Sequence, residues 1–146
     1  MPEFDKKISP FLQRSGEDLI SSLHRLTDGL IFTSETDAPV EVIQGGDAST
    51  DSPASVLKRV RDNRAGEPIQ EISFDEFFDR LAKIQEWYGT EERDRAIRYA
   101  QLRDLLTNSL RDLKVLRIGR VQIDIYVVGL NKKNELLGIK TKAVET

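Results

Sequence analysis

Three stretches in the last third of the chain alternate apolar and polar residues with a period of two, and they constrain the fold more than any other feature. The stretches are residues 115–119, 121–129 and 135–144, and the link 130–134 reads as a hairpin loop. Such alternation is typical of strands that bury one face. We therefore expect a largely antiparallel sheet with helices packed against it, an α+β arrangement within the broad α/β class.

The central stretch of the three assigns its residues to two faces, because side chains alternate along a strand. Asp124 falls on the polar face, where we expect it to be exposed to solvent. The residues expected to share the buried face are Val121, Ile123, Ile125 and Val127.

Two helices are predicted from apolar residues that recur at helical spacing. The first spans 16–27 and stops at Gly29, which supplies the left-handed turn that commonly ends a helix. The second spans 91–112 and begins after Thr90, a residue suited to capping the first turn. Both helices therefore present an apolar stripe to the expected sheet.

A third helix, over residues 74–83, carries the clearest local start signal in the chain. Ser73 and Glu76 have the spacing of a capping box, in which the side chains bond to each other's backbone N–H groups. Ile72 and Phe77 flank this box at the positions of a hydrophobic staple. The pattern indicates that the helix begins directly after Ser73.

The segments before this helix have weaker patterns. We expect the chain to emerge as a loop near 34–37, followed by a short strand at 40–43. Turn-forming residues predict a loop at 44–54. A short helix at 55–63 and a strand at 68–72 complete the interpretation.

Length and composition favour one domain of a soluble chain. The 146 residues contain no cysteine, which excludes disulfides and thiolate catalysis. No apolar run approaches the roughly 18 residues of a membrane span, and the first residues lack a secretory pattern. We expect a loose leader over 1–15, a domain over 16–146, no membrane contact and a cytoplasmic location.

Charge and missing motifs argue against most enzyme classes and against binding of nucleic acid. The net charge of −3 makes the chain a poor binder of phosphate backbones. His24 is the single histidine and can form neither a triad nor a metal cluster alone. A solvated helix face is the favoured interpretation of one basic cluster. Its members are Lys58, Arg59, Arg61 and Arg64.

Trp87 and Tyr88 lie in the connection between two predicted helices, beside Gln85 and Glu86. Large aromatic residues at such a joint usually plug the edge of the core, since tryptophan is on average highly buried. The alternative is an exposed anchor, because tryptophan is enriched at interface hot spots. The high average burial of tryptophan favours the interpretation that Trp87 fills the edge of the core.

The end of the chain offers a second choice of interpretation. The last predicted strand stops just before Glu145 and Thr146. A plain solvent-facing end is the commonest outcome. The carboxylate of Glu145, the hydroxyl of Thr146 and the terminal carboxylate are nevertheless hard oxygen ligands that could imitate a phosphate and ligate Mg²⁺.

Three stretches of the sequence together resemble the nuclease A inhibitor family, which inhibits a sugar-non-specific DNA/RNA endonuclease. They are LTDGLIFTSETDAPVEV at 26–42, the FF…QEWY segment around 77–88, and LRIGRVQIDIYVVG…LLGIKTKAVET from 116 to the end. The resemblance continues in register to Thr146. The segments 1–15 and 44–70 carry no matching motif.

The resemblance implies a three-layer α-β-α sandwich without catalytic activity or a cofactor of its own. It further implies a monomer that forms a 1:1 complex with a Mg²⁺-dependent nuclease and inserts into the active-site cleft. Thr146 would ligate the magnesium of the target, and Glu35 would meet a catalytic arginine. The remaining partner-binding residues would be Gln85, Trp87, Glu86 and Glu145.

Two other functions remain open from the sequence. An interaction domain of the same fold could bind a partner that is not a nuclease, since 1–15 and 44–70 match no family motif. A small metal-dependent hydrolase could use some of the 25 acidic residues. The absence of paired histidine or cysteine ligands disfavours the hydrolase.

Overall fold

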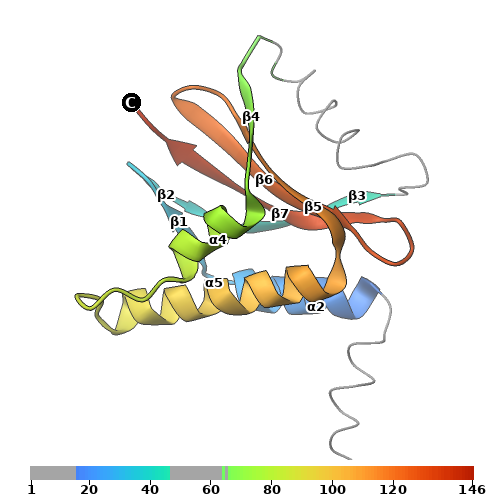
Figure 1. Cartoon of the computed structure of the whole chain (residues 1–146), viewed down its shortest axis with the longest axis horizontal. Helices are drawn as coiled ribbons and strands as arrows, with labels where there is room; N and C mark the ends of the chain where they lie inside the picture. Colours follow the sequence, from blue (N-terminus) through green and yellow to red (C-terminus); the bar gives the residue numbers. More distant parts are fainter. Residues whose placement is uncertain (1–15, 47–63, 65) are drawn as a thin grey trace, which may run out of the picture.

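The computed structural model of the chain describes residues 16–46, 64 and 66–146. Figure 1 shows helices lying along one side of a twisted sheet within these ranges. The helices are α2 (Gly16–Thr27), α4 (Phe74–Ala82) and α5 (Thr90–Ser109). The strands are β1 (Ile31–Thr33), β2 (Asp37–Pro39), β3 (Glu41–Gly46), β4 (Ile69–Ile72), β5 (Arg111–Ile118), β6 (Gln122–Leu130) and β7 (Leu136–Val144).

The main sheet has five strands in the order β3-β7-β6-β5-β4, and every neighbouring pair is antiparallel. Strands β6 and β7 form the longest hairpin, in which Leu130 pairs with Leu136 beside the connecting loop. Strands β1 and β2 form a separate two-stranded sheet. The predicted α+β class and antiparallel sheet are therefore confirmed.

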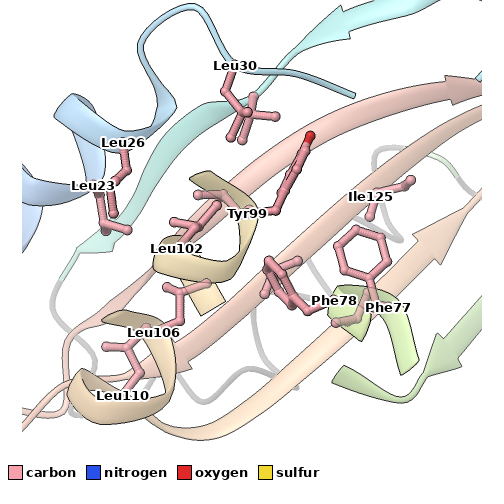
Figure 2. Close-up of a cluster of buried hydrophobic side chains, with 14 of the residues drawn as sticks. Leu23, Leu26, Leu30, Phe77, Phe78, Tyr99, Leu102, Leu106, Leu110 and Ile125 are labelled. Atoms are coloured by element: carbon pink, nitrogen blue, oxygen red, sulfur yellow. The ribbon is translucent and has the colours of Figure 1, made fainter. Parts of the chain in front are cut away.

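The core lies between the sheet and the three helices (Figure 2). Phe78 of α4, Leu102 of α5 and Ile125 of β6 are each at most 2% exposed. Ile123 and Val127 are buried with Ile125, as the alternation predicts, whereas Val121 is exposed. A smaller apolar cluster of Val128, Leu130 and Leu136 lies apart from this core. The second helical layer of the expected sandwich stays a prediction.

The end of α2 and the start of α4 follow from the predicted signals. Helix α2 spans the expected residues, and Gly29 after it has a φ of 72°. At α4 the backbone N–H of Glu76 donates to Ser73 Oγ at 3.2 Å. The staple residues Ile72 and Phe77 both pack in the main core. No helix in the described ranges is long and apolar enough to cross a membrane.

The long helix departs from its predicted bounds at both ends. Its N-cap is Gly89, whose N–H donates to Glu92 Oε1 at 3.1 Å, so the prediction of Thr90 as the cap was wrong. It stops at Ser109, not at 112, and β5 begins after one intervening residue, at Arg111. Leu110 continues the helical spacing and is buried as an extended residue, so apolar spacing did not mark the end.

Strand β3 extends into the segment predicted as a loop, because Gln44 and Gly46 pair with Leu137 and Leu136 of β7 across an irregularity in register. Strand β4 agrees with its prediction apart from one residue. The predicted leader 1–15, the rest of the loop after 46 and the helix at 55–63 lie outside the described residues.

Asp124 is not exposed as predicted: its side chain retains 18% of its accessible surface. Arg64 Nη1 lies 3.1 Å from Asp124 Oδ2 and also donates to the carbonyl of Ile118 at 2.9 Å. Arg64 Nη2 donates to the carbonyl of Gln122 at 3.0 Å. The one described member of the predicted basic cluster therefore clamps the β5–β6 turn, a long-range contact that strand alternation could not reveal.

Candidate functional site

A β-hairpin of two short strands presents the Ser34–Glu35–Thr36 segment. Strand pairing runs from Ile31 opposite Pro39 to Thr33 opposite Asp37. At the tip, the N–H of Ser34 donates to the carbonyl of Thr36 at 2.9 Å. The loop near 34–37 was expected, but its two flanking strands were not, since three residues are too few to display alternation.

Helices α4 and α5 and strand β7 hold the hairpin against the body of the protein. The hydroxyl of Tyr99 donates to the carbonyl of Ile31 at 2.6 Å, and burial raises the pKa of Tyr99 far above its usual value. The ring of Phe32 stacks on Phe77 with centroids 5.9 Å apart. The hydroxyl of Thr141 donates to the carbonyl of Pro39 at 2.9 Å.

The last three residues of the chain, 144–146, form a tail that lies beside the hairpin tip. The N–H of Val144 donates to Ser34 Oγ at 3.0 Å, and the N–H of Glu35 donates to the carbonyl of Val144 at 3.3 Å. The N–H of Glu145 donates to the carbonyl of Val121 at 2.9 Å. The tail is therefore bonded to the hairpin on one side and to the β5–β6 turn on the other.

Glu35 and Thr146 meet directly although they lie 111 positions apart in the sequence. The N–H of Thr146 donates to Glu35 Oε2 at 2.6 Å, and its hydroxyl lies 3.0 Å from both carboxylate oxygens. Both residues are exposed. Because the hydroxyl proton is directed to Glu35, the hydroxyl lone pairs remain available for another group.

The carboxylate of Glu145 contacts the chain's own Arg117. Arg117 Nη2 lies 2.6 Å from Glu145 Oε2, and the two side chains are 21% and 50% exposed respectively. This distance is that of a charge-assisted hydrogen bond. Glu145, predicted as a partner contact, is thus already paired within the molecule.

The connection between α4 and α5 is built differently. Trp87 is 74% exposed and contacts Tyr88 edge to face, with ring centroids 4.7 Å apart. The interpretation of Trp87 as a core plug was therefore wrong. The N–H of Tyr88 donates to the carbonyl of Gln85 at 3.1 Å and closes a turn that includes the exposed Glu86.

The model of the nuclease A inhibitor-like protein family, NuiA, matches residues 17–146. The chain belongs to this family. No curated protein matches the chain. This is a family of inhibitors, and the general class of partner that it implies is a nuclease.

The structure of this nuclease A inhibitor-like protein brings two of the residues expected to bind a partner, Glu35 and Thr146, into direct contact. Glu145 precedes Thr146 in the tail. No hydrogen bond or ion pair in the described part of the chain links the side chains of Gln85, Glu86 or Trp87 to the tail. Figure 1 nevertheless places the C terminus, the hairpin tip and the α4–α5 connection on the left of the view.

Sequence reasoning missed two residues that build the site, Ser34 and Arg117. The sequence indicates Ser34 only as a loop residue, because its bond to Val144 joins positions 110 apart. Arg117 carried a usable signal: it shares a strand face with Val115, which is fully buried. A charged side chain on a core-facing strand position requires a partner.

The described residues contain no group of three or more histidine, cysteine, aspartate or glutamate side chains arranged to hold a metal ion. The Glu35 carboxylate and the Thr146 hydroxyl instead form a small, exposed set of oxygen atoms. Such a set is suited to completing the coordination of a cation that another protein holds.

Proposed function

We propose that the protein inhibits a Mg²⁺-dependent, sugar-non-specific nuclease by inserting the hairpin tip and the C-terminal tail into the active-site cleft. The observation that carries this proposal is the direct contact of Glu35 with Thr146. The contact gathers acidic and hydroxyl oxygens at one exposed point of an inhibitor-family chain. These are the atoms with which a protein can imitate a phosphate.

Glu35 is proposed to meet a catalytic arginine of the nuclease. A carboxylate has two oxygens and about four lone-pair sites, so it can accept the tail's donors and those of a guanidinium together. Arginine and carboxylate pair with bidentate geometry, as arginine and phosphate do. Glu35 would therefore occupy the place of a substrate phosphate.

Thr146 is proposed to ligate the magnesium ion of the nuclease. Mg²⁺ prefers oxygen ligands and usually retains waters, which an incoming hydroxyl or carboxylate can replace. The hydroxyl of Thr146 donates a hydrogen bond to Glu35, which leaves the lone pairs of the hydroxyl oxygen for a cation.

Trp87, with Gln85 and Glu86 beside it, is proposed as a second contact outside the metal site. An indole that is 74% exposed can bury a large apolar area when a partner covers it. The edge-to-face contact with Tyr88 limits its movement. The proposed contact would contribute affinity through area, whereas the tail contributes through charge and coordination.

The complex is proposed to contain one inhibitor and one nuclease and to form in the cytoplasm. The inhibitor itself is proposed to have no catalytic activity. A net charge of −3 favours association with the basic cleft of a nucleic-acid enzyme. Size-exclusion chromatography with light scattering would test the stoichiometry. A peak with the mass of two inhibitors per nuclease would contradict it.

The test of the function is a titration of a purified, Mg²⁺-dependent, sugar-non-specific endonuclease with the purified protein. Both DNA and RNA hydrolysis should fall together to near zero at a 1:1 ratio, because both substrates use the same cleft. Undiminished hydrolysis at a large excess of the protein would contradict the proposal. Mg²⁺-dependent turnover of nucleic acid by the protein alone would contradict its assignment as a non-enzyme.

A further inference from the structure

We propose that Arg117 is a positioning residue that fixes the direction of the C-terminal tail through Glu145. This inference rests on the proposed inhibition of a nuclease by the tail. It assigns Glu145 an internal role in place of a contact with the partner. The observations that carry it are the ion pair itself and the arrangement of the bonds around it.

Arg117 lies on β5, and the tail continues from β7, so β6 separates the two residues in the sheet. The guanidinium nevertheless lies 2.6 Å from the Glu145 carboxylate. Arg117 is the less exposed partner, at 21% of its side-chain surface. The long side chain of Arg117 therefore reaches across β6 to bind Glu145, which follows the end of β7.

Each of the three tail residues is bonded to the hairpin tip or to strand β5. Val144 is held by Ser34, and Thr146 is held by Glu35, both in the hairpin tip. Glu145 is held by Arg117. The backbone N–H of Glu145 is held as well, by the carbonyl of Val121 in the β5–β6 turn at 2.9 Å. The tail is thus fixed from both sides.

The Glu145 carboxylate would otherwise add a free negative charge next to the residue that contacts the nuclease. Arg117 neutralises this charge and removes rotamers from Glu145. Ordering a segment before association reduces the entropy that binding must overcome. Arg117 thereby acts on inhibition without contacting the nuclease.

The pair remains accessible to salt. Arg117 also lines a groove of about 580 Å³ between β4 and α4. Salt screens charges that solvent reaches. A high salt concentration should therefore weaken the Arg117–Glu145 pair of the native chain and make its tail behave like that of a variant without Arg117.

The experiment compares R117M, E145Q and the double variant with the native chain. R117M keeps most of the side-chain length and removes the charge. Each single variant should raise the inhibition constant about fivefold, the scale of one partly exposed ion pair. The double variant should be no weaker than the weaker single variant, because both remove the same interaction.

R120M is the matched control. Arg120 is three residues away and exposed, and it has no ion-pair partner among the described residues. It loses the same charge as R117M, so it reports the long-range effect of charge on association. R120M should change the inhibition constant much less than R117M.

A second readout does not require the nuclease. Hydrogen exchange of the Glu145 and Thr146 amides, followed by NMR, should accelerate in R117M and E145Q but not in R120M. The amides of β6 should keep their protection in all variants. This pattern would separate a loosened tail from a destabilised fold.

Two results would overturn the inference. One is an inhibition constant of R117M equal to that of a native chain that does inhibit the nuclease. The other is unchanged amide exchange of the tail in R117M. A native chain that inhibits no nuclease would instead overturn the proposed function, and the exchange measurement would still decide whether Arg117 orders the tail.

Discussion

The hairpin tip with its tail and the α4–α5 connection differ in how firmly the rest of the molecule holds them. Glu35 and the tail residues bond to one another, to the β5–β6 turn and to Arg117. Trp87 is 74% exposed, and its ring contacts that of its neighbour Tyr88. The first region is therefore ordered before a partner arrives, and the second presents an open aromatic surface.

This difference separates two ways of contributing to affinity. A preordered cluster loses little conformational entropy on binding and fixes the geometry of charged contacts. An exposed indole contributes mainly through the apolar area that the partner covers. Changes in the hairpin and tail should therefore alter both inhibition and local order, whereas changes at Trp87 should alter inhibition alone.

The largest effect is expected from E35Q. The substitution removes the charge that would face the arginine and one of the two carboxylate acceptors of Thr146. Inhibition should weaken about thirtyfold or more, the scale of a hot-spot loss. D37N removes the same charge from the same hairpin and should have a small effect. Equal losses in the two variants would indicate a general charge effect, contrary to the account.

W87A tests the open region. Inhibition should weaken about tenfold, because an exposed hot-spot tryptophan typically contributes at least that much. The thermal unfolding midpoint should not change, since the indole buries little surface in the free protein. The matched variant I97A, at a partly exposed isoleucine on α5, should leave inhibition intact. A large loss of stability in W87A would contradict the contrast between the two regions.

S34A sharpens the comparison from the side of the preordered cluster. Without Ser34 Oγ, the N–H of Val144 loses its acceptor. We expect the free energy of unfolding to fall by about 1 kcal/mol and inhibition to weaken about fivefold. T36A removes a neighbouring hydroxyl that bonds to no described residue and serves as the control. Amide exchange of Val144 would show whether the tail has been released.

Y99F should have the smallest effect on inhibition, since Tyr99 supports the base of the hairpin and not its tip. Loss of its bond to Ile31 should lower the free energy of unfolding by about 1 kcal/mol. Burial raises the pKa of Tyr99 in the folded state. Its contribution to stability is thus complete below about pH 10, the unfolded value, and declines above it.

The pH dependence distinguishes this variant from the others. Denaturant unfolding between neutral pH and about pH 11 should show a steeper loss of stability in the native chain than in Y99F. Parallel pH profiles for the two proteins would contradict the assignment of Tyr99 as a buried, neutral hydrogen-bond donor.

The sheet and most helix starts could be predicted because they depend on local patterns. Period two defines β6 and β7, and Ser73 with Glu76 marks the start of α4. The end of α5 could not be predicted, because Leu110 continues the apolar spacing of the helix and is buried although its backbone is extended. Strands β1 and β2 are too short to carry a periodic signal.

The site could be predicted only in part, since its contacts join distant positions. The family resemblance singled out Glu35 and Thr146 separately, and their spacing of 111 residues carries no information about contact. Arg117 was detectable as a charge on a core-facing strand position, but its partner Glu145 was not. For Trp87 the sequence was misleading, because the high average burial of tryptophan favoured a core position and the residue is exposed.

The tail is proposed to act as the metal-directed end of an inhibitor. The most direct measurement is the inhibition constant of the native chain, of a chain lacking Thr146 and of a chain with one residue added after it. Both altered chains should lose about thirtyfold or more in potency while keeping the native unfolding midpoint. Native potency in either altered chain would contradict the account.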